Sequence, residues 1–502
     1  MFVAFLMLSI QATLAAAGNP PAQEIPAQTI TANTTWPNIG VPYHVAGNIT
    51  VASGATLTVA AGTELAFAPS AALTVNGSLS VQGSAEQNVE FRRDDPAQAW
   101  GGIVLNAGSS SNFRQARIRG AATCVTVNGG TQDIANSVIS ECTGNGAYLS
   151  SASNVILANS HIVQNQTGLY VASGSPRIEN NLIVENSSYG IFSNSNAAPK
   201  IRYNTIDLNG DDGVYFSQPS ASLVFENNIV TRNRIGLYAY YGSDFSRGNN
   251  NVWGNGTDRQ SSGAAYITAP KASEISSDPQ YQSPYLGDWR LNAGSPSKTA
   301  SSAGGEIGAY GNGGNVAVYN PGYSTMPTTS GSLTQNERWS GDVVLTGDVT
   351  VNWPWRLVIE PGTRIKVPAN ASLTVNSLAS LVGSAESPII FEAASGGGQW
   401  SGLTIGNSAA ASVVRYVQIT GANTCLNLSG TAHEINHNII NGCGTAIMVN
   451  SGGPKIENNL IVENSSYGIF SNSNAAPKIR YNTIDLNGDD GVYFSQPSAS
   501  LV

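Results

Sequence analysis

Short apolar runs flanked by Asn, Gly or Ser recur at even spacing along much of the chain. Six of them align as seven-residue segments: NSVISEC, NSHIVQN, NNLIVEN, YNTIDLN, NNIVTRN and NNNVWGN. Their first residues, 21 to 24 positions apart, are Asn136, Asn159, Asn180, Tyr203, Asn227 and Asn249. The fourth position is always Ile or Val, and no stretch sustains the 3.6-residue spacing of an amphipathic helix. The pattern therefore predicts repeated short strands and few helices.

A period of about 22 residues fits one coil of a parallel β-solenoid, in which each coil stacks about 4.8 Å above the last. Equivalent side chains then form columns. The fourth positions predict a dry interior column of Ile139, Ile162, Ile183, Ile206 and Val230. The Asn positions predict columns at bends, where an amide can bond its counterpart one coil away and Asn tolerates left-handed backbone. A leucine-rich repeat has a similar period, but the sequence lacks its regular leucine consensus.

A longer repeat divides the chain into two halves. Residues 178–224 and 456–502 are identical at all 47 positions, at an offset of 278. Farther upstream the halves match loosely at offsets of 300 and 301, so the second half has lost 23 residues, about one coil. We therefore predict an all-β protein of two tandem parallel β-helices, of which the second is truncated.

The repeat also predicts how the chain is divided. We expect a signal peptide at 1–17, a spacer at 18–35, a first β-helix with its closing segment at 36–311, a linker at 312–335 and a second β-helix at 336–502. The signal peptide is indicated by an apolar run that ends in three alanines before a Gly/Pro stretch. No other segment is apolar enough to span a membrane. An incomplete last coil leaves strand edges unpaired, so we expect fraying or self-association over 456–502.

The repeat NxIxxN, followed by Gly, an aliphatic residue and an aromatic residue, resembles that of right-handed parallel β-helix proteins in the pectin-lyase-like superfamily. The resemblance covers about 110–260 and 412–502. The stretches NNNVWGN, DPQY, GDWRLNAGSPS and EIGAYG, between 249 and 311, resemble the closing segment of extracellular helices of this kind. The resemblance implies a right-handed coil and a bacterial extracellular or surface protein. It also keeps open a polysaccharide lyase or glycoside hydrolase.

Composition narrows the choice of partner. Charged residues make up 11% of the chain, against roughly 25% in typical soluble domains, and the net charge is −9. Nucleic-acid phosphates favour partners rich in Lys and Arg, so the sequence argues against a nucleic-acid partner.

The triplets of Gly, a small or aliphatic residue and an aromatic residue predict a second column. Alternation along a strand sends the middle residue inward and the aromatic residue outward. The outward rings are Tyr148, Tyr170, Phe192, Tyr215 and Tyr238; Phe470 and Tyr493 continue the pattern in the second half, where Met448 interrupts it. This ladder is our candidate ligand-binding surface, because pyranose faces pack on aromatic rings. The alternative is that the rings only stabilise the sheet by stacking.

Acidic residues cluster within one coil and supply the candidates for catalysis: Asp207, Asp211 and Asp212, with Glu185 one coil earlier. Paired carboxylates can act as acid and base in glycoside hydrolysis, or offer oxygen ligands to Ca²⁺. A lyase would also need a cationic base, for which Arg202 and Arg232 lie on neighbouring coils. The alternatives are that the adjacent Asp211 and Asp212 belong to a turn and that the arginines are solvated surface residues. We expect no cofactor, with Ca²⁺ as the one alternative.

Cysteine and histidine spacing indicates no metal site. The four cysteines form two pairs 18 residues apart, Cys124 with Cys142 and Cys425 with Cys443. In an exported protein each pair is a candidate disulfide across one coil, and two buried thiols are the alternative. The histidines are scattered at His44, His161, His433 and His437.

Taken together, the residues favour an exported, non-catalytic β-helix scaffold at the cell surface or outside the cell, with polysaccharide bound along the aromatic ladder. A polysaccharide lyase or glycoside hydrolase is the first alternative. A purely structural stalk or adhesin repeat without a ligand is the second. The glycan and the oligomeric state are left open.

Overall fold

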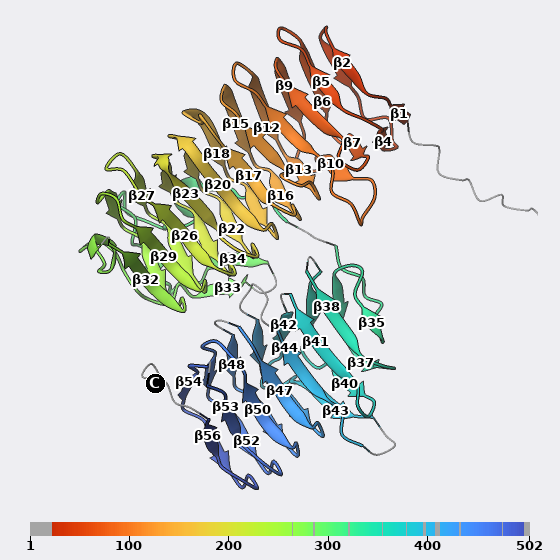
Figure 1. The fold of residues 1–502 in the computed structure, drawn as a ribbon, viewed down its shortest axis with the longest axis vertical. Coiled ribbons are helices and arrows are strands. Elements are labelled where there is room, and N and C mark those ends of the chain that lie inside the picture. The colour runs from red at the N-terminus through yellow and green to blue at the C-terminus, as the bar shows by residue number, and fades with distance from the viewer. Residues whose placement is uncertain are drawn as a thin grey trace, which may run out of the picture.

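The computed structural model describes residues 23–263, 265–284, 287–319, 322–353, 355–377, 379–394, 398–406, 412–430, 433–473 and 475–495. The expected signal peptide at 1–17 lies outside these residues. The described chain forms two solenoids, each built from three parallel sheets (Figure 1). The all-β, parallel fold predicted from the repeat is confirmed, whereas the interpretation of the solenoids as two copies of one unit stays a prediction.

The first solenoid has sheets 1A, 1B and 1C, and the chain visits them in that order in each coil. Sheet 1A contains β1 (Gln23–Ile25), β4 (Tyr43–Val45), β7 (Glu64–Phe67), β10 (Val89–Arg93), β13 (Ala116–Arg119), β16 (Val138–Ser140), β19 (His161–Val163), β22 (Leu182–Val184), β25 (Thr205–Asp207), β28 (Ile229–Thr231) and β31 (Asn251–Trp253). Sheet 1B contains β2 (Gln28–Ile30), β5 (Ile49–Val51), β8 (Ala72–Val75), β11 (Gly102–Leu105), β14 (Val125–Val127), β17 (Asn145–Leu149), β20 (Thr167–Gly174), β23 (Ile191–Ala197), β26 (Asp212–Ser217), β29 (Ile235–Tyr240) and β32 (Thr257–Ser262). Sheet 1C contains β3 (Thr34–Trp36), β6 (Thr56–Ala60), β9 (Ser78–Gln82), β12 (Ser110–Arg114), β15 (Thr131–Ala135), β18 (Asn154–Ala158), β21 (Arg177–Glu179), β24 (Lys200–Arg202), β27 (Val224–Glu226) and β30 (Ser246–Gly248).

The second solenoid has the equivalent sheets 2A, 2B and 2C. Sheet 2A contains β37 (Asp342–Val344), β40 (Arg364–Val367), β43 (Ile389–Ala393), β46 (Val417–Thr420), β49 (Ile439–Asn441), β52 (Leu460–Val462) and β55 (Thr483–Asp485). Sheet 2B contains β35 (Gly331–Ser332), β38 (Val349–Asn352), β41 (Ser372–Asn376), β44 (Gly402–Ile405), β47 (Thr424–Leu428), β50 (Thr445–Val449), β53 (Ile469–Ser471) and β56 (Val492–Phe494). Sheet 2C contains β36 (Glu337–Trp339), β39 (Leu357–Ile359), β42 (Ala379–Val382), β45 (Val413–Arg415), β48 (Glu434–Asn436), β51 (Lys455–Glu457) and β54 (Lys478–Arg480).

The predicted interior column is confirmed by the strand register. In sheet 1A the residues pair in sequence, Ile139 with Ile162, then Ile183, Ile206 and Val230. All five side chains are fully buried. Each buried Ile or Leu side chain stabilises the fold by about 1.5–3 kcal/mol relative to an exposed one, so this column is a main source of stability.

The Asn residues at the bends have two roles, one in side-chain hydrogen bonds between coils and the other in left-handed backbone. The segment-ending amides form a buried ladder: Asn186 Nδ2 donates to Asn209 Oδ1 at 2.9 Å, and Asn209 Nδ2 donates to Asn233 Oδ1 at 3.0 Å. The first residue of the segment instead has left-handed backbone, with φ of 50° at Asn159 and 57° at Asn180. Asn suits both places, because it satisfies buried polar groups and tolerates positive φ.

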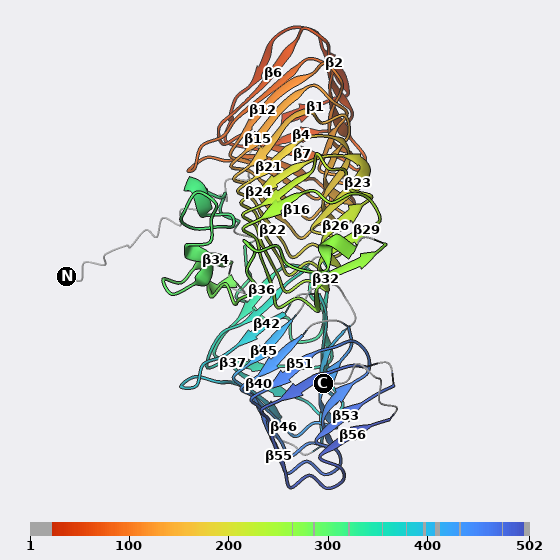
Figure 2. The same ribbon diagram turned by 90° about the vertical axis from the view of Figure 1, so that its left-hand side faces the viewer.

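Residues 278–284 and 287–319 form a closing segment. It follows the last coil in sequence and packs against the outer face of sheet 1A. It contains the antiparallel strands β33 (Tyr281–Ser283) and β34 (Asp288–Leu291) and the short 3₁₀ turns η3 (Pro296–Lys298) and η4 (Gly311–Gly313); η1 (Ala265–Ile267) precedes it. Figure 2 shows this green segment on the flank of the first solenoid. Its side chains Trp289, Ala309 and Val316 pack with those of Val163, Leu182 and Val184 on the outer face of the sheet.

Structured segments extend across two of the expected boundaries. Residues 23–36, mostly assigned to a spacer, form the first coil, because Ile25, Ile30 and Trp36 point inward and are buried. The expected linker at 312–335 begins instead as part of the closing segment, since Asn315 N donates to Asn159 Oδ1 at 2.9 Å. The second solenoid then starts at β35, within that linker. Within the described residues, no helix is long and apolar enough to cross a membrane.

The two solenoids contact one another through buried polar groups. Arg356 of the second solenoid forms an ion pair with Glu185 of the first at 3.0 Å, and both side chains are nearly inaccessible to solvent. Farther along, Lys455 Nζ donates to Gly254 O at 3.1 Å and lies 5.9 Å from the ring centre of Trp253. These contacts hold the second solenoid beside the last coils of the first.

Candidate functional site

The five predicted rings form one column on the outer face of sheet 1B. Strands β17, β20, β23, β26 and β29 place them in register, one ring per coil. Neighbouring ring centres are 5.3, 4.7, 4.8 and 5.0 Å apart from Tyr148 through Tyr170, Phe192 and Tyr215 to Tyr238. Every ring is half-buried. The residues therefore lie where the sequence predicts.

The stacking geometry changes what this ladder can offer a ligand. The ring planes are nearly parallel, 4° apart between Phe192 and Tyr215 and 8° apart between Tyr170 and Phe192. Their faces contact one another, so a sugar ring would meet the inner rings at their edges rather than at their faces. Solvent reaches the ring edges, where the tyrosine hydroxyls can donate and accept hydrogen bonds.

Aromatic side chains are more exposed to solvent at the end of the ladder next to Tyr238. Tyr240 follows Tyr238 on the same outward side of β29 and is 40% exposed, and the adjoining Tyr241 is 51% exposed. Their rings meet at 86°, edge to face. Sequence reasoning missed this pair, although the stretch YAYYG at 238–242 is its signal.

A charged cluster borders the ladder. The Arg234 guanidinium reaches Asp211 Oδ1 at 2.5 Å and Asp212 Oδ1 at 2.9 Å. Burial, together with the neighbouring carboxylate of Asp211, raises the pKa of Asp212 to about 7. The ring of Tyr189 packs edge-on against Phe192 and Tyr215, and burial and the two carboxylates raise its pKa. Sequence analysis identified the two aspartates but missed Arg234 and Tyr189.

Asp207 does not belong to this cluster, because its side chain is buried elsewhere, beneath the closing segment. Its side chain is fully buried, and Arg232 Nε donates to its Oδ1 at 2.9 Å while Trp289 Nε1 donates to its Oδ2 at 2.7 Å. A carboxylate held in this way beneath the closing segment has no path to a polymer at the surface. The Asp207 side chain is therefore inaccessible to solvent, in contrast to that of Asp211.

The other polar candidates are also separated from one another. Glu185 is paired with Arg356, Arg202 with Glu226, and the side chain of Arg232 is buried against Asp207 rather than solvated as the alternative expected. His161 and His433 are buried, His44 lies near Asp94, and His437 packs on Tyr416. Within the residues described, no three His, Cys, Asp or Glu side chains are arranged to hold a metal ion.

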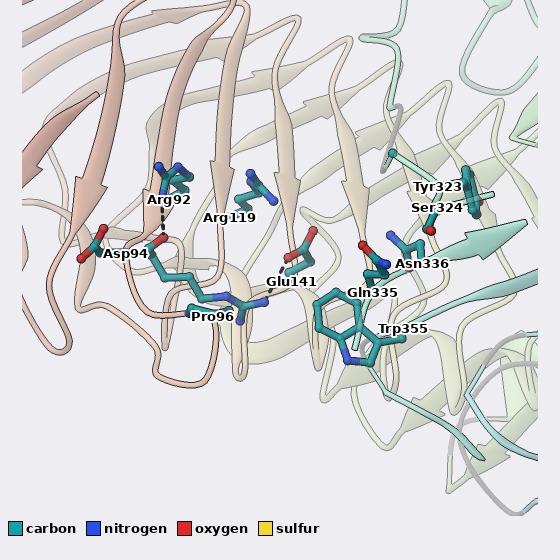
Figure 3. Close-up of a pocket in the computed structure, with 12 residues that line it drawn as sticks. Arg92, Asp94, Pro96, Arg119, Glu141, Tyr323, Ser324, Gln335, Asn336 and Trp355 are labelled. Carbon is teal, nitrogen blue, oxygen red and sulfur yellow. Dashed lines mark hydrogen bonds and ion pairs between the residues drawn. The ribbon is translucent and has the colours of Figure 1, made fainter. Parts of the chain in front are cut away.

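A cleft of about 710 Å³ lies between sheet 1A and the start of the second solenoid. Figure 3 shows Arg92, Arg119 and Glu141 along one side, and Tyr323, Asn336 and Trp355 along the other. Each arginine of the cleft has a carboxylate partner: Arg92 pairs with Glu64, Arg93 with Glu141 and Arg119 with Glu90. Because its cations are already compensated, this cleft is a weaker anion site than three arginines alone would suggest.

Each cysteine pair lies on neighbouring coils and is joined in a disulfide. The Cα atoms are 5.8 Å apart in Cys124–Cys142 and 5.9 Å apart in Cys425–Cys443. Both spacings fall within the range that a disulfide spans. All four sulfurs are buried inside the coils.

The three parallel sheets with inward aliphatic columns define a parallel β-helix protein. A family model for the right-handed beta helix region matches residues 101–255 and 400–502, more than half of the chain, and the chain belongs to this family. No curated protein sequence matches the chain. Among solved structures it is similar to a PL6 family alginate lyase, AlyGC, at 13% identity over 96% of both chains with a TM-score of 0.32. An arginine-to-alanine mutant of that lyase is similar at 12% identity, also over 96% of both chains, with a TM-score of 0.29.

Proposed function

We propose that the protein is an exported, non-catalytic β-helix scaffold that holds polysaccharide against the outer face of sheet 1B. The observation that carries the proposal is the continuous aromatic strip from Tyr148 to Tyr241, which runs across five consecutive coils and ends in two exposed tyrosines. A long strip with one ring per coil suits an extended polymer better than a compact ligand. Sugar rings would stack on the open tyrosines and accept hydrogen bonds along the ring edges.

The non-catalytic part of the proposal is supported by the state of the acidic groups. Asp207 is buried under the closing segment, and Asp211 and Asp212 share the guanidinium of Arg234. Carboxylates that already form ion pairs within the protein have fewer oxygen lone pairs left to contact a substrate. Buried or half-buried pairs of this kind fit a structural role at the turn before β26.

The test is retention of the full chain by a panel of acidic and neutral polysaccharides in affinity electrophoresis, with and without Ca²⁺. We expect at least one polymer to retard the protein, and Tyr240→Ala/Tyr241→Ala to weaken this retention roughly tenfold. Tyr481→Ala is the matched control, because Tyr481 is 81% exposed on the second solenoid, away from the strip. Retention that is unchanged in the double variant would refute binding at the strip, and no retention by any polymer would favour a structural stalk.

One observation favours a polysaccharide lyase or glycoside hydrolase as a second candidate. The raised pKa of Asp212, about 7, lets this carboxyl exchange a proton near neutral pH beside the aromatic strip. If this candidate is right, polysaccharide is shortened during incubation and Asp212→Asn abolishes the shortening. Retention of an intact polymer by both wild type and Asp212→Asn would eliminate it.

A further inference from the structure

The outer face of sheet 1B is built almost entirely from uncharged side chains. Its eleven strands all lie within the described residues, and together they contain three charged residues, Asp212, Asp258 and Arg259. Arg259 pairs in register with the buried Leu237, so its side chain points into the coil, where it forms an ion pair with Glu274. The strands of this sheet therefore direct no cation outward.

The column of rings continues in both directions as uncharged side chains. Strand pairing adds one residue per coil before Tyr148 and one more after Tyr238; these are Thr126, Val104, Thr74, Thr50 and Thr29 before the rings and Gln260 after them. The residues that directly follow β8, β11 and β14 add a ladder of amides. Asn128 Nδ2 donates to Asn106 Oδ1 at 3.1 Å, and Asn106 Nδ2 donates to Asn76 Oδ1 at 2.8 Å. A ligand on this face therefore meets ring edges, hydroxyls and amides.

The cations of the first solenoid lie mainly on its other two sheets, as with Arg92 on sheet 1A and Arg114 on sheet 1C. Next to the rings, Arg234 occupies the turn before β29, where its guanidinium is shared by Asp211 and Asp212. One guanidinium that faces two carboxylates leaves no surplus of positive charge beside the aromatic strip.

This distribution of charge favours one class of polymer. Acidic polysaccharides carry carboxylates, which lose part of their hydration when the polymer lies on a protein face. Charge-assisted hydrogen bonds from Arg or Lys compensate for that loss, but the guanidinium of Arg234 is already engaged. Sugar hydroxyls both donate and accept hydrogen bonds, as do the side chains of Thr, Asn, Gln and Tyr. The face therefore matches the chemistry of sugar hydroxyls rather than that of carboxylates.

We propose that the polymer held along sheet 1B is an uncharged polysaccharide. This inference rests on the proposed function and names the class of polymer for the same face. The rings and the threonine column form one continuous track for the polymer. The net charge of −9 on the chain adds a weak repulsion against any polyanion.

The experiment measures retention of the full chain by matched pairs of polymers in affinity electrophoresis. Each pair consists of an acidic polysaccharide, polygalacturonate or alginate, and the same polymer after reduction of its carboxyl groups to alcohols; galactomannan and arabinoxylan extend the neutral set. We expect at least one neutral polymer to bind roughly tenfold more tightly than either acidic one. This retention should be nearly the same in about 20 and about 500 mM NaCl, because no ion pair contributes to it.

Two charge variants test whether the neutral face itself excludes acidic polymers. Thr74→Arg/Thr126→Arg places two cations in the column of the rings, on strands separated by one coil. We expect this variant to gain retention by an acidic polymer, and the gain to disappear at high salt. Thr58→Arg/Asn112→Arg is the matched control, because it places the same charges at the same spacing on sheet 1C. The control should not gain this retention.

The possible failures can be told apart. Wild-type chain that binds acidic polymers as tightly as neutral ones overturns this inference and leaves polysaccharide binding intact. An equal gain in both arginine variants shows that sheet 1B does not set the preference, and also overturns it. If no polymer of either kind retards the chain, the proposed function fails and the inference fails with it. Unchanged thermal unfolding midpoints would confirm that both variants are folded.

Discussion

Arg356 and Glu185 join the two solenoids through an ion pair of 3.0 Å, with side chains only 3% and 1% exposed. The two residues are 171 positions apart in sequence, and each would leave a buried charge behind if the other were removed. Burial raises the pKa of Glu185, while the guanidinium beside it acts in the opposite direction. Each charge of this buried contact is therefore compensated by the other.

Removing one partner of this pair should be costly. We expect Arg356→Met to lower the free energy of unfolding by about 3–5 kcal/mol, because it leaves the Glu185 carboxylate buried and unpaired. Arg356→Met with Glu185→Met should recover much of that loss, since no charge then stays behind. Denaturant unfolding of the three proteins measures both effects. Equal stabilities would show that the solenoids do not depend on this contact.

The buried histidine beneath the closing segment should make stability depend on pH. Burial lowers the pKa of His161 to about 3, and its ring packs edge-on against Trp289 and Tyr319. The folded-state pKa of His161 lies below the unfolded value near 6.5. Protonation of His161 therefore costs the folded state no stability above pH 6.5, and the free energy of unfolding decreases as the pH falls from 6.5 toward 3. Between pH 7.5 and 4.5 the loss is about 2–3 kcal/mol.

His161→Phe is the variant that isolates this effect, because it keeps an aromatic ring but cannot be protonated. Unfolding free energies of both proteins at pH 7.5 and 4.5 give the comparison, and the wild type should lose about 2–3 kcal/mol more than the variant. The same loss in both proteins would assign the pH dependence to other groups.

The identical coils allow one substitution to be compared in two environments. Leu182→Ala should cost about 2–5 kcal/mol, because the side chain is buried under the closing segment. Leu460→Ala should cost less than about 1 kcal/mol, since the Leu460 side chain itself is 39% exposed. Thermal and denaturant unfolding of the two variants measure the difference. Equal costs would mean that the face of sheet 2A is covered in solution.

The disulfides should contribute to stability through the loops they close. Each joins cysteines 18 residues apart, for which the chain-entropy estimate is about 3 kcal/mol. Thiol titration of the denatured, unreduced protein should find no free thiol, and Cys124→Ser/Cys142→Ser should lower the unfolding midpoint. Four titratable thiols in protein from an oxidising environment would contradict the pairing.

The sequence predicted the fold well because a solenoid is a local repeat. The fourth position of each segment identified Ile139 through Val230 as one interior column, since every coil returns to the same place. The outward column from Tyr148 to Tyr238 followed from simple alternation. The stacking of these rings, given above as the alternative interpretation, follows from a strand spacing near 4.8 Å, which brings parallel rings into contact.

The environments of the candidate side chains depended on contacts that periodicity does not describe. Asp207 is buried by Trp289, which is 82 residues away and lies outside the repeat. Arg234 reaches Asp211 from the next coil, and Glu185 is paired by the second solenoid. A repeat specifies which residues are neighbours within the coils, but not which face a later segment covers.

Binding without cleavage is tested most directly by the mass of a polysaccharide recovered in complex with the protein, measured by size-exclusion chromatography with light scattering. For a non-catalytic scaffold we expect at least one polymer to co-elute with the full chain at its original mass after prolonged incubation. A bound polymer whose mass falls with time would contradict a non-catalytic scaffold, and the absence of co-elution for every polymer would contradict binding.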